Sequence, residues 1–272
     1  MAGPRDYQVE GVVIRLADVG ERDRIVTLFT RDEGKLAFVA RGARRPGSTL
    51  GPCVQMLSRG RYQCVRRRAL HLITQASAVD SYAKLRAELW STSCCLYLAE
   101  LIDAATVEGS PDRMLYDLIV ELLDRVNQKG ANDVLLRYFE LRLLQHTGFC
   151  PSLRRCVACG AELRPVENAF SAVLGGVLCP DCVSTAPDAS PLSVDALKVL
   201  RFWLANPLDI SCRTKLDEDL ATEIEEHLRR ILESVVQRDL RSRAWLVRLR
   251  RERLLTGNGE APTIAQHVDS ER

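Results

Sequence analysis

Four cysteines stand in two closely spaced pairs in the second half of the chain. Cys156 and Cys159 form one C-x2-C pair, and Cys179 and Cys182 form the other after 19 intervening residues. Each pair fits a tight turn that directs both sulfur atoms toward one point, and Gly160 can adopt the positive φ that such a turn often needs. The spacing predicts a zinc ribbon, in which four thiolates close a tetrahedral shell around one structural Zn²⁺. A redox dithiol pair and four coincidental core thiols are the alternatives.

The segment around these cysteines is too small to fold on an apolar core of its own. Residues 151–185 contain the four cysteines and a candidate hairpin at 170–178. Bound zinc would supply roughly 10 to 16 kcal/mol of folding free energy to such an insert. The N-terminus has no secretion signal, so we expect a cytoplasmic protein whose clustered cysteines bind metal instead of forming disulfides. Cys94 and Cys95 fall within an apolar helical pattern and are predicted to pack in a core.

The first 80 residues carry the pattern of short β-strands. Apolar and polar residues alternate, β-branched residues are frequent, and Gly and Pro separate the segments. Five strands are predicted, at 7–16, 24–30, 35–40, 54–66 and 70–78. Five short strands in about 75 residues suit a small closed barrel, because closure hides the strand edges.

At Ser81 the apolar period changes from two to about 3.6. Helices are predicted from 81 to about 102, after Ser110, over 133–146, over 193–205 and over 220–235. The cysteine insert interrupts this bundle without ending it. The predicted fold is therefore multidomain α+β, with a barrel at 1–80, a helical bundle at 81–150 and 186–255, and a zinc ribbon insert at 151–185. Residues 256–272 are predicted to be a disordered tail.

A net charge of +2 for the whole chain hides a basic first domain. Residues 1–80 hold 14 Lys and Arg against 8 Asp and Glu, a local charge of +6. Cationic barrels of this size track the phosphates of single strands, and few aromatic residues are available for stacking, so binding should be electrostatic and salt-sensitive. The candidate nucleic-acid-binding residues are Arg22, Arg24, Lys35, Arg41, Arg44, Arg45, Arg59, Arg61, Arg66, Arg67 and Arg68.

Several classes of protein are excluded by composition and by missing motifs. Hydrophobic residues make up 46% and charged residues 27% of 272 residues, which excludes a disordered chain. No apolar run approaches the length of a membrane span. A P-loop, a G-x-S-x-G elbow, a dinucleotide fingerprint and an H-E-x-x-H motif are all absent from the sequence, so nothing in it suggests ATP hydrolysis.

Several short segments carry a resemblance to a known protein family, in the order in which they occur. They are Glu-Arg-Asp-Arg-Ile-Val-Thr-Leu-Phe-Thr at 21–30, Glu-Gly-Lys-Leu at 33–36, Ala-Arg-Gly-Ala-Arg-Arg-Pro at 40–46, Thr-Gly-Phe at 147–149, Gly-Gly-Val-Leu-Cys at 175–179 and Arg-Asp-Leu-Arg-Ser at 238–242. Together with the order of barrel, helices, cysteine insert and helices, they make the chain resemble the RecO family of bacterial recombination mediators. The segment 24–46 is the most specific part of the match.

The resemblance implies a non-enzymatic role in DNA repair, recombination and the SOS response. An N-terminal OB-fold would bind single- and double-stranded DNA and anneal complementary strands without ATP. It implies contacts with RecR and with the C-terminal tail of single-stranded DNA-binding protein, so that the recombinase is loaded at gaps, and a cytoplasmic, nucleoid-associated location. Lys35, Arg41, Arg44 and Arg45 match the basic strand and loop that face DNA.

The site for the acidic, apolar-ended tail of that partner is expected near the C-terminus. Arginines stand beside apolar residues there, and the candidates are Arg241, Arg243, Trp245 and Arg248. A solvated last helix packed back on the bundle is the alternative. For the whole protein, an RNA-binding or transcription-associated zinc-ribbon protein is the alternative function. A zinc hydrolase or nuclease is disfavoured, because four thiolates leave no open metal position.

Overall fold

The computed structural model of this chain describes residues 6–236 and 239–255. These form two compact units, one containing the described residues up to 131 together with 240–255, and the other containing the described residues of 132–239. The last helix thus belongs with the N-terminal unit. The four-part domain division predicted from the sequence stays a prediction, and the predicted tail at 256–272 lies outside the described residues.

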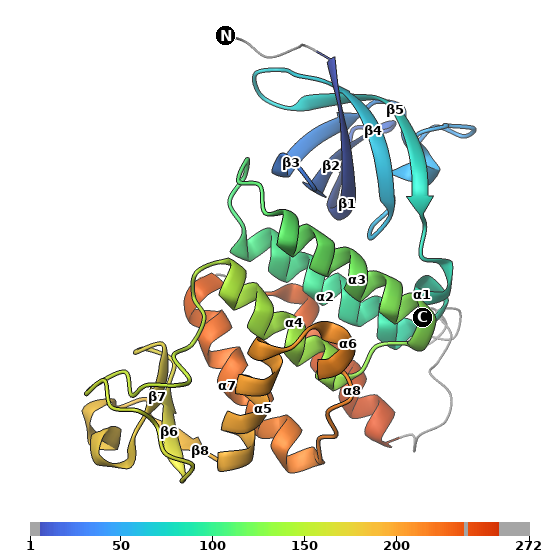
Figure 1. Cartoon of the computed structure of the whole chain (residues 1–272). Coiled ribbons are helices and arrows are strands. Elements are labelled where there is room, and N and C mark those ends of the chain that lie inside the picture. The colour runs from blue at the N-terminus through green and yellow to red at the C-terminus, as the bar shows by residue number, and fades with distance from the viewer. Residues whose placement is uncertain (1–5, 237–238, 256–272) are drawn as a thin grey trace. The chain divides into compact units, whose positions relative to one another are not determined.

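A closed five-stranded barrel forms the start of the first unit (Figure 1). Its strands are β1 (Asp6–Val19), β2 (Asp23–Thr30), β3 (Gly34–Ala40), β4 (Arg59–Val65) and β5 (His71–Asp80). They close in the order β1-β2-β3-β5-β4, and all pairs are antiparallel except β3 with β5. This is the arrangement of an OB-fold, so the predicted barrel is confirmed.

The alternation along the strands places one apolar set inside the barrel. Val13, Val26, Phe38 and Tyr62 are all completely buried in its core. The predicted fourth strand at 54–66 begins only at Arg59, because residues 57 and 58 instead hydrogen-bond to the backbone of Val13 in β1. A short 3-10 helix, η1 (Gly51–Cys53), precedes this segment.

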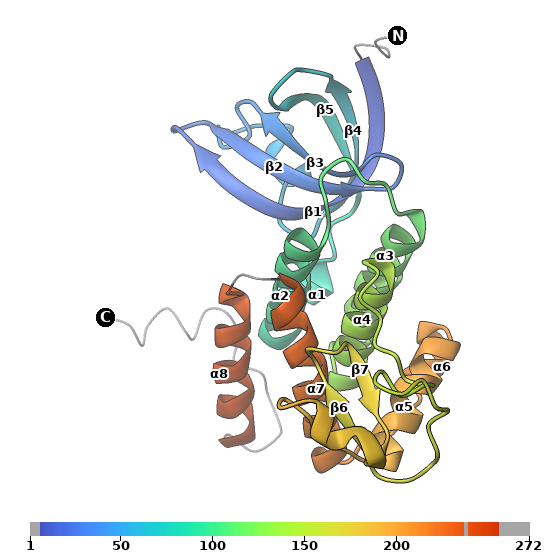
Figure 2. The ribbon, with the colours of Figure 1, turned by 90° about the vertical axis from the view of Figure 1, so that its left-hand side faces the viewer.

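Helices α1 (Ala83–Ala87), α2 (Leu89–Ala105), α3 (Arg113–Lys129) and α8 (Arg241–Leu255) complete the first unit. The single helix predicted from residue 81 is broken at Glu88, which has an extended backbone and accepts hydrogen bonds from the N–H groups of Trp90 and Ser91. Glu88 therefore caps a new helix instead of continuing the first. Cys94 and Cys95 on α2 are buried as predicted, and α8 packs against α2 (Figure 2).

The second unit combines helices with a small sheet. Its helices are α4 (Asp133–His146), α5 (Val194–Ala205), α6 (Leu208–Ser211) and α7 (Glu218–Val236), and its strands are β6 (Asn168–Ser171), β7 (Gly176–Leu178) and β8 (Ser190–Leu192). β6 lies between β7 and β8, and a 3-10 helix, η2 (Pro180–Thr185), follows β7. The sequence predicted the hairpin and the start of α5 at Ser193, which caps the helix. Residues 184–191 are typical of a linker by composition, but Ser190 and Pro191 instead form the third strand with Leu192.

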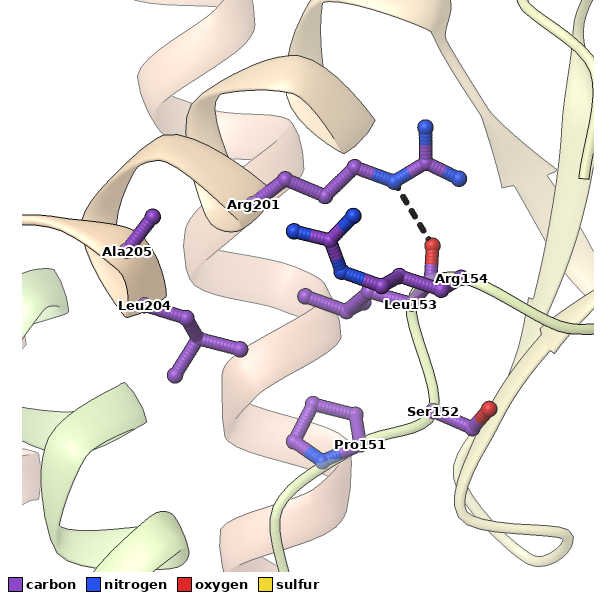
Figure 3. A pocket seen from close by; sticks show the side chains of 7 residues that line it. All are labelled: Pro151, Ser152, Leu153, Arg154, Arg201, Leu204 and Ala205. Atoms are coloured by element: carbon purple, nitrogen blue, oxygen red, sulfur yellow. Dashed lines mark hydrogen bonds between the residues drawn. The ribbon is translucent and has the colours of Figure 1, made fainter.

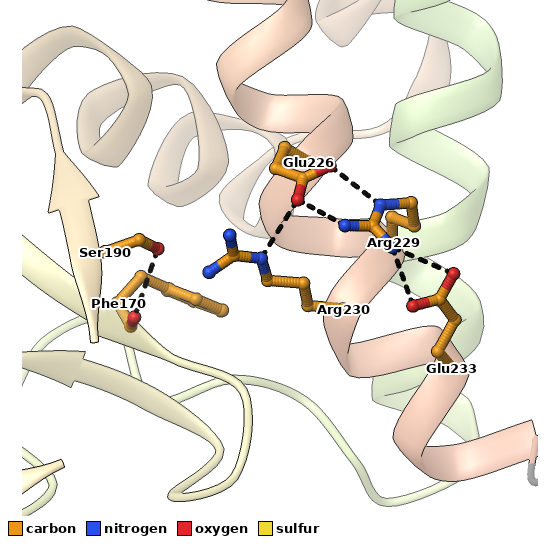
Figure 4. A network of polar contacts seen from close by, with 6 residues as sticks. All are labelled: Phe170, Ser190, Glu226, Arg229, Arg230 and Glu233. Atoms are coloured by element: carbon orange, nitrogen blue, oxygen red, sulfur yellow. Dashed lines mark hydrogen bonds and ion pairs between the residues drawn. The ribbon is translucent and has the colours of Figure 1, made fainter. Parts of the chain in front are cut away.

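Acidic neighbours neutralise the arginines of α7. Arg229 pairs with Glu226 and Glu233, and Arg230 also pairs with Glu226 (Figure 4). Hydrogen bonds from Arg229 lower the pKa of Glu226 to about 2. Burial opposes this shift, and the hydrogen bond from Arg230 adds to it. Arg229 and Arg230 therefore do not form a cationic surface on α7.

Candidate metal centre and nucleic-acid interface

The four cysteines of the two C-x2-C pairs converge on one point in the second unit. The sulfur atoms of Cys156, Cys159, Cys179 and Cys182 all lie within 4.8 Å of one another. The Sγ atoms of Cys159 and Cys179 are 3.8 Å apart. Two sulfurs bound tetrahedrally to one zinc ion at 2.3 Å would be about 3.8 Å apart. The cluster has the dimensions of a site that could bind a metal ion.

Tight turns hold each cysteine pair in place. Gly160 has a φ of +74°, as the sequence predicted, and its N–H donates to the carbonyl oxygen of Cys156 at 2.9 Å. The N–H of Cys182 donates to the carbonyl of Cys179 at the same distance. Each turn brings its two sulfurs to one side without help from a large core, because the geometry is set by the backbone.

The hairpin of β6 and β7 joins the two cysteine pairs. The N–H of Val177 donates to Ser152 and its carbonyl accepts from Val157, so β7 is tied to the chain that leads into Cys156. A Cβ atom at Gly176 would lie 2.6 Å from the backbone oxygen of Ser152. Glycine is required there by this close approach, which explains one residue of the Gly-Gly-Val-Leu-Cys segment.

The pKa values of the thiols in the cluster differ strongly from one cysteine to another. Burial would raise the pKa of Cys156, but hydrogen bonds from the backbone N–H groups of Cys159 and Cys179, among others, lower it to about 6. Hydrogen bonds with the thiols of Cys179 and Cys159 raise the pKa of Cys182 to about 12. Four thiols this close cannot all ionise unless a cation offsets their repulsion, so the donor set fits a thiophilic metal ion.

The structure brings five of the predicted basic residues together at one end of the barrel. Arg22 lies in the β1–β2 turn, Arg24 at the start of β2, and Arg41, Arg44 and Arg45 in the loop after β3. The loop is tied to the turn because the N–H of Arg44 donates to the carbonyl oxygen of Arg22 at 3.0 Å. We call these five residues the hairpin cluster.

Only part of the positive charge in the hairpin cluster is compensated. Asp18 pairs with Arg24 at 2.9 Å and with Arg44 at 3.4 Å. Arg22, Arg41 and Arg45 are exposed, and none of them has an ion-pair partner within the described part of the chain. The same hairpin also carries Glu21 and Asp23, and Asp23 accepts from the N–H of Gly42 at 2.8 Å. Five guanidinium groups therefore lie beside three carboxylates, which leaves this end of the barrel with a net positive charge.

The β4–β5 loop carries a second basic group. Arg66 pairs with Glu33 at 3.3 Å and lies over the ring of Tyr7, 4.6 Å from its centroid. Arg67 and Arg68 are exposed and have no ion pair among residues 6–236 and 239–255. OB-folds bind oligonucleotides through the face of strands 2 and 3 and through the β1–β2 and β4–β5 loops, which are the places where these arginines lie.

Three of the predicted nucleic-acid-binding residues form ion pairs with carboxylates of the same unit. Lys35 is 13% exposed, and its Nζ donates to the backbone oxygen of Asp103 on α2 at 2.5 Å and pairs with its carboxylate at 3.4 Å. Arg59 and Arg61 both pair with Glu10, at 2.6 and 3.2 Å. These contacts favour a structural role for Lys35 and Arg59. Their carboxylate partners gave no signal in the sequence, because they come from distant positions.

Helix α8 uses its predicted partner-binding residues partly for packing. The N–H of Arg241 donates to Glu100 of α2 at 3.1 Å, and Nε1 of Trp245 donates to the hydroxyl of Ser93 at 3.2 Å. Arg248 pairs with Glu252 on the same helix. Arg243 is half-buried. A helix packed back on its neighbours is thus observed, and the peptide site on it stays a prediction.

Two family models cover most of the chain. Residues 1–82 match the N-terminal domain of recombination protein O, and residues 86–244 match its C-terminal domain. This chain belongs to the RecO family. Three proteins called DNA repair protein RecO are similar to it over most of their length. That of Roseiflexus sp. strain RS-1 is 37% identical, covering 89% of this chain and 85% of the relative.

Two further RecO relatives support the same assignment. The protein of Symbiobacterium thermophilum is 36% identical over 91% of this chain and 99% of the relative, and that of Desulforudis audaxviator is 35% identical over 89% and 96%. The resemblance inferred from the short segments is therefore confirmed, and the chain is a member of a family of DNA repair proteins. Across the described residues, no helix has the length and apolar character needed to span a membrane.

Proposed function

We propose that this RecO-family protein is a non-enzymatic recombination mediator that binds single- and double-stranded DNA and anneals complementary strands without ATP. The hairpin cluster carries the proposal. It sets unpaired, exposed guanidinium groups on the β1–β2 turn, one of the loops through which OB-folds bind oligonucleotides, and on the loop after β3 that is hydrogen-bonded to this turn. Phosphate contacts of this kind are independent of base sequence, as an annealing factor requires.

The metal site has a supporting role in this proposal. We assign one Zn²⁺ to Cys156, Cys159, Cys179 and Cys182, because four thiolates at tetrahedral spacing are a typical structural zinc donor set. When bound, the ion neutralises the thiolates and links both ends of the ribbon. The four side chains close its shell, so no water is held there for hydrolysis.

The proposed protein partners follow from membership of the family. They are RecR and the C-terminal tail of single-stranded DNA-binding protein, with which this chain would help to load the recombinase at gaps in the nucleoid. Arg241, Arg243, Trp245 and Arg248 remain candidates for the tail. The exposed faces of Trp245 and Arg248 support this candidate, since an aromatic ring beside a guanidinium suits an apolar, acidic peptide.

The test is the annealing of two complementary DNA strands by the purified full-length protein without nucleotide. Strands are presented bare or coated with single-stranded DNA-binding protein, at low and at moderate salt. Annealing that persists on coated strands and decreases with salt is the expected result. No annealing at any salt by folded, zinc-loaded protein would contradict the proposal, and tighter binding to RNA than to DNA of the same sequence would favour an RNA-binding function.

A double charge reversal locates the interface. Arg41→Glu and Arg45→Glu change exposed residues without ion pairs, so DNA affinity should fall while the thermal midpoint is retained. Each lost phosphate contact lowers the magnitude of the log–log salt slope for single strands by about 0.7. The matched control, Arg164→Glu with Arg213→Glu, changes two exposed arginines of the other unit. An equal loss of DNA affinity in the control would mean that only net charge matters.

A further inference from the structure

The second unit contains a surface pocket that none of the functions above uses. It has a volume of about 360 Å³ and lies between the chain leading into the ribbon and the end of α5. Figure 3 shows two guanidinium groups in it, one from each of these segments. The lining consists of Pro151, Ser152, Leu153, Arg154, Arg201, Leu204 and Ala205.

The two arginines of the pocket have no carboxylate partner. Neither Arg154 nor Arg201 has an ion pair within 4.0 Å anywhere in the described sequence. They are close enough that burial and the charge of Arg154 lower the pKa of Arg201, which Glu162 only partly offsets. Two like charges held together with only partial compensation create a site where an anion is stabilised.

The backbone fixes one of these arginines in position. Nε of Arg201 donates to the carbonyl oxygen of Leu153 at 2.7 Å (Figure 3). This hydrogen bond orients the guanidinium plane and leaves its two terminal amino groups available. Arg154 is exposed and brings a second guanidinium from the opposite segment. Donors that approach from two segments suit a tetrahedral phosphate, whose oxygens point in several directions, better than a planar carboxylate.

The rest of the pocket is apolar. Pro151 and Leu153 are buried residues whose side chains line it, and Leu204 and Ala205 at the end of α5 complete the wall. This surface has no polar side chain apart from that of Ser152. A ligand that fits has an anionic group next to a flat or bulky apolar body, as a nucleotide of a single strand does.

We propose that this pocket is a second contact for single-stranded DNA, in which Arg154 and Arg201 hold one backbone phosphate and the apolar wall receives the adjoining base. The inference rests on the proposed DNA-binding function and extends it to the second unit. A strand bound there is held independently of the barrel, so one protein molecule can engage two DNA segments. Annealing should then depend on this pocket more strongly than the binding of a single short strand does.

The test uses the full-length protein carrying Arg41→Glu and Arg45→Glu, so that the remaining affinity for a short oligo-dT reports other sites. Adding Arg154→Gln and Arg201→Gln should weaken binding about fivefold at 0.1 M salt and lower the magnitude of the salt slope by about 0.7, as expected for one phosphate contact. The matched control is Arg164→Gln with Arg213→Gln, which removes two exposed arginines of the same unit outside the pocket. Zinc content and the thermal midpoint verify that each variant is folded.

The outcomes separate this inference from the proposed function. A loss in the pocket variant but not in the control supports the site, and in the otherwise unaltered protein the same variant should reduce annealing. Equal losses in both variants, or none in either, overturn it while leaving the barrel assignment intact. A third outcome would assign the pocket to a protein partner. In that case an acidic peptide ending in phenylalanine binds the protein, this binding is lost when Arg154 and Arg201 are changed, and DNA binding is unchanged. If Arg201→Gln unfolds the unit, the test can be made with Arg154→Gln alone, because the Arg154 side chain is exposed.

Discussion

The barrel and the ribbon are both built from short strands, but different forces hold them together. Barrel strands have 7 to 14 residues and enclose a core with completely buried aromatic and aliphatic side chains. Strands of the ribbon sheet have three or four residues, and the four thiols at its end lie at the surface or just beneath it. The barrel is held by its buried apolar core, whereas we propose that the ribbon depends on metal coordination by its four cysteines.

The comparison also extends to what each region offers to a ligand. Closure of the barrel satisfies all strand edges, so its loops are free to carry unpaired arginines at little cost in stability. The ribbon uses its turns to position the four cysteines, and its polar chemistry serves its own folding. In the barrel, the residues that could bind a ligand are therefore different from those that stabilise the fold. In the ribbon, the same cysteines would serve both purposes.

The largest expected effect is the loss of zinc from the ribbon. Cys179→Ser should release the metal and remove a large part of the roughly 10 to 16 kcal/mol that structural zinc contributes. Metal analysis and thermal unfolding measure this loss, and a DNA titration measures the barrel. Much of the DNA affinity should remain, and an equal loss of both properties would show that the two regions are not separable.

The reverse experiment weakens the barrel core. Phe38 is completely buried, and Phe38→Ala should lower the free energy of unfolding by about 3 to 5 kcal/mol through the lost contacts and the cavity left behind. Urea unfolding gives the size of the effect. Zinc content should stay at one ion per chain, and a variant that also releases zinc would contradict the separate origins of stability.

A smaller effect distinguishes structural cations from binding cations within the barrel. Lys35→Met removes the 3.4 Å ion pair with Asp103, a carboxylate that is 8% exposed and also pairs with Arg15 at 3.6 Å, so stability should fall by about 1 to 3 kcal/mol while DNA affinity is kept. Arg31→Met is the matched control, because its pair with Asp117 is exposed on both sides and contributes under about 1 kcal/mol. Loss of DNA affinity without loss of stability would show that Lys35 belongs to the DNA-binding interface.

The smallest expected effect is a pH dependence of packing around the ribbon. His227 on α7 is 3% exposed and contacts Phe170 of β6, and burial lowers its pKa below the ordinary 6.5, opposed by Glu223. The folded state thus disfavours the protonated ring. Stability is complete above pH 6.5 and decreases as the pH falls through 6.5 toward the folded-state pKa.

Thermal midpoints between pH 7.5 and 5.5 test this linkage. The loss of stability in this range should be smaller in His227→Leu than in the unaltered chain. Acid also protonates the cysteines, but this contribution is common to both proteins and cancels in the difference. Identical pH profiles would exclude His227 as the source.

Much of the fold could be predicted from local pattern. Period-two alternation located the barrel strands, and the period of 3.6 with its caps located α4 and α5 to within a residue. The break at Glu88 and the strand at 190–192 could not be predicted, because each depends on a hydrogen-bond alternative that the apolar pattern does not encode. Residues 190–192 form strand β8 only because the edge of β6 is available for backbone hydrogen bonds.

The sequence by itself determined the closed barrel, the cysteine ribbon and an excess of cations in the first 80 residues, because periodicity and ligand spacing are local properties. Only the tertiary structure decided which cations are free. Glu10 meets Arg59 across 49 positions, and Asp103 meets Lys35 across 68. The pocket of Arg154 and Arg201 likewise joins separate segments. Coulomb energies depend on distance in space, and chain folding alone sets those distances.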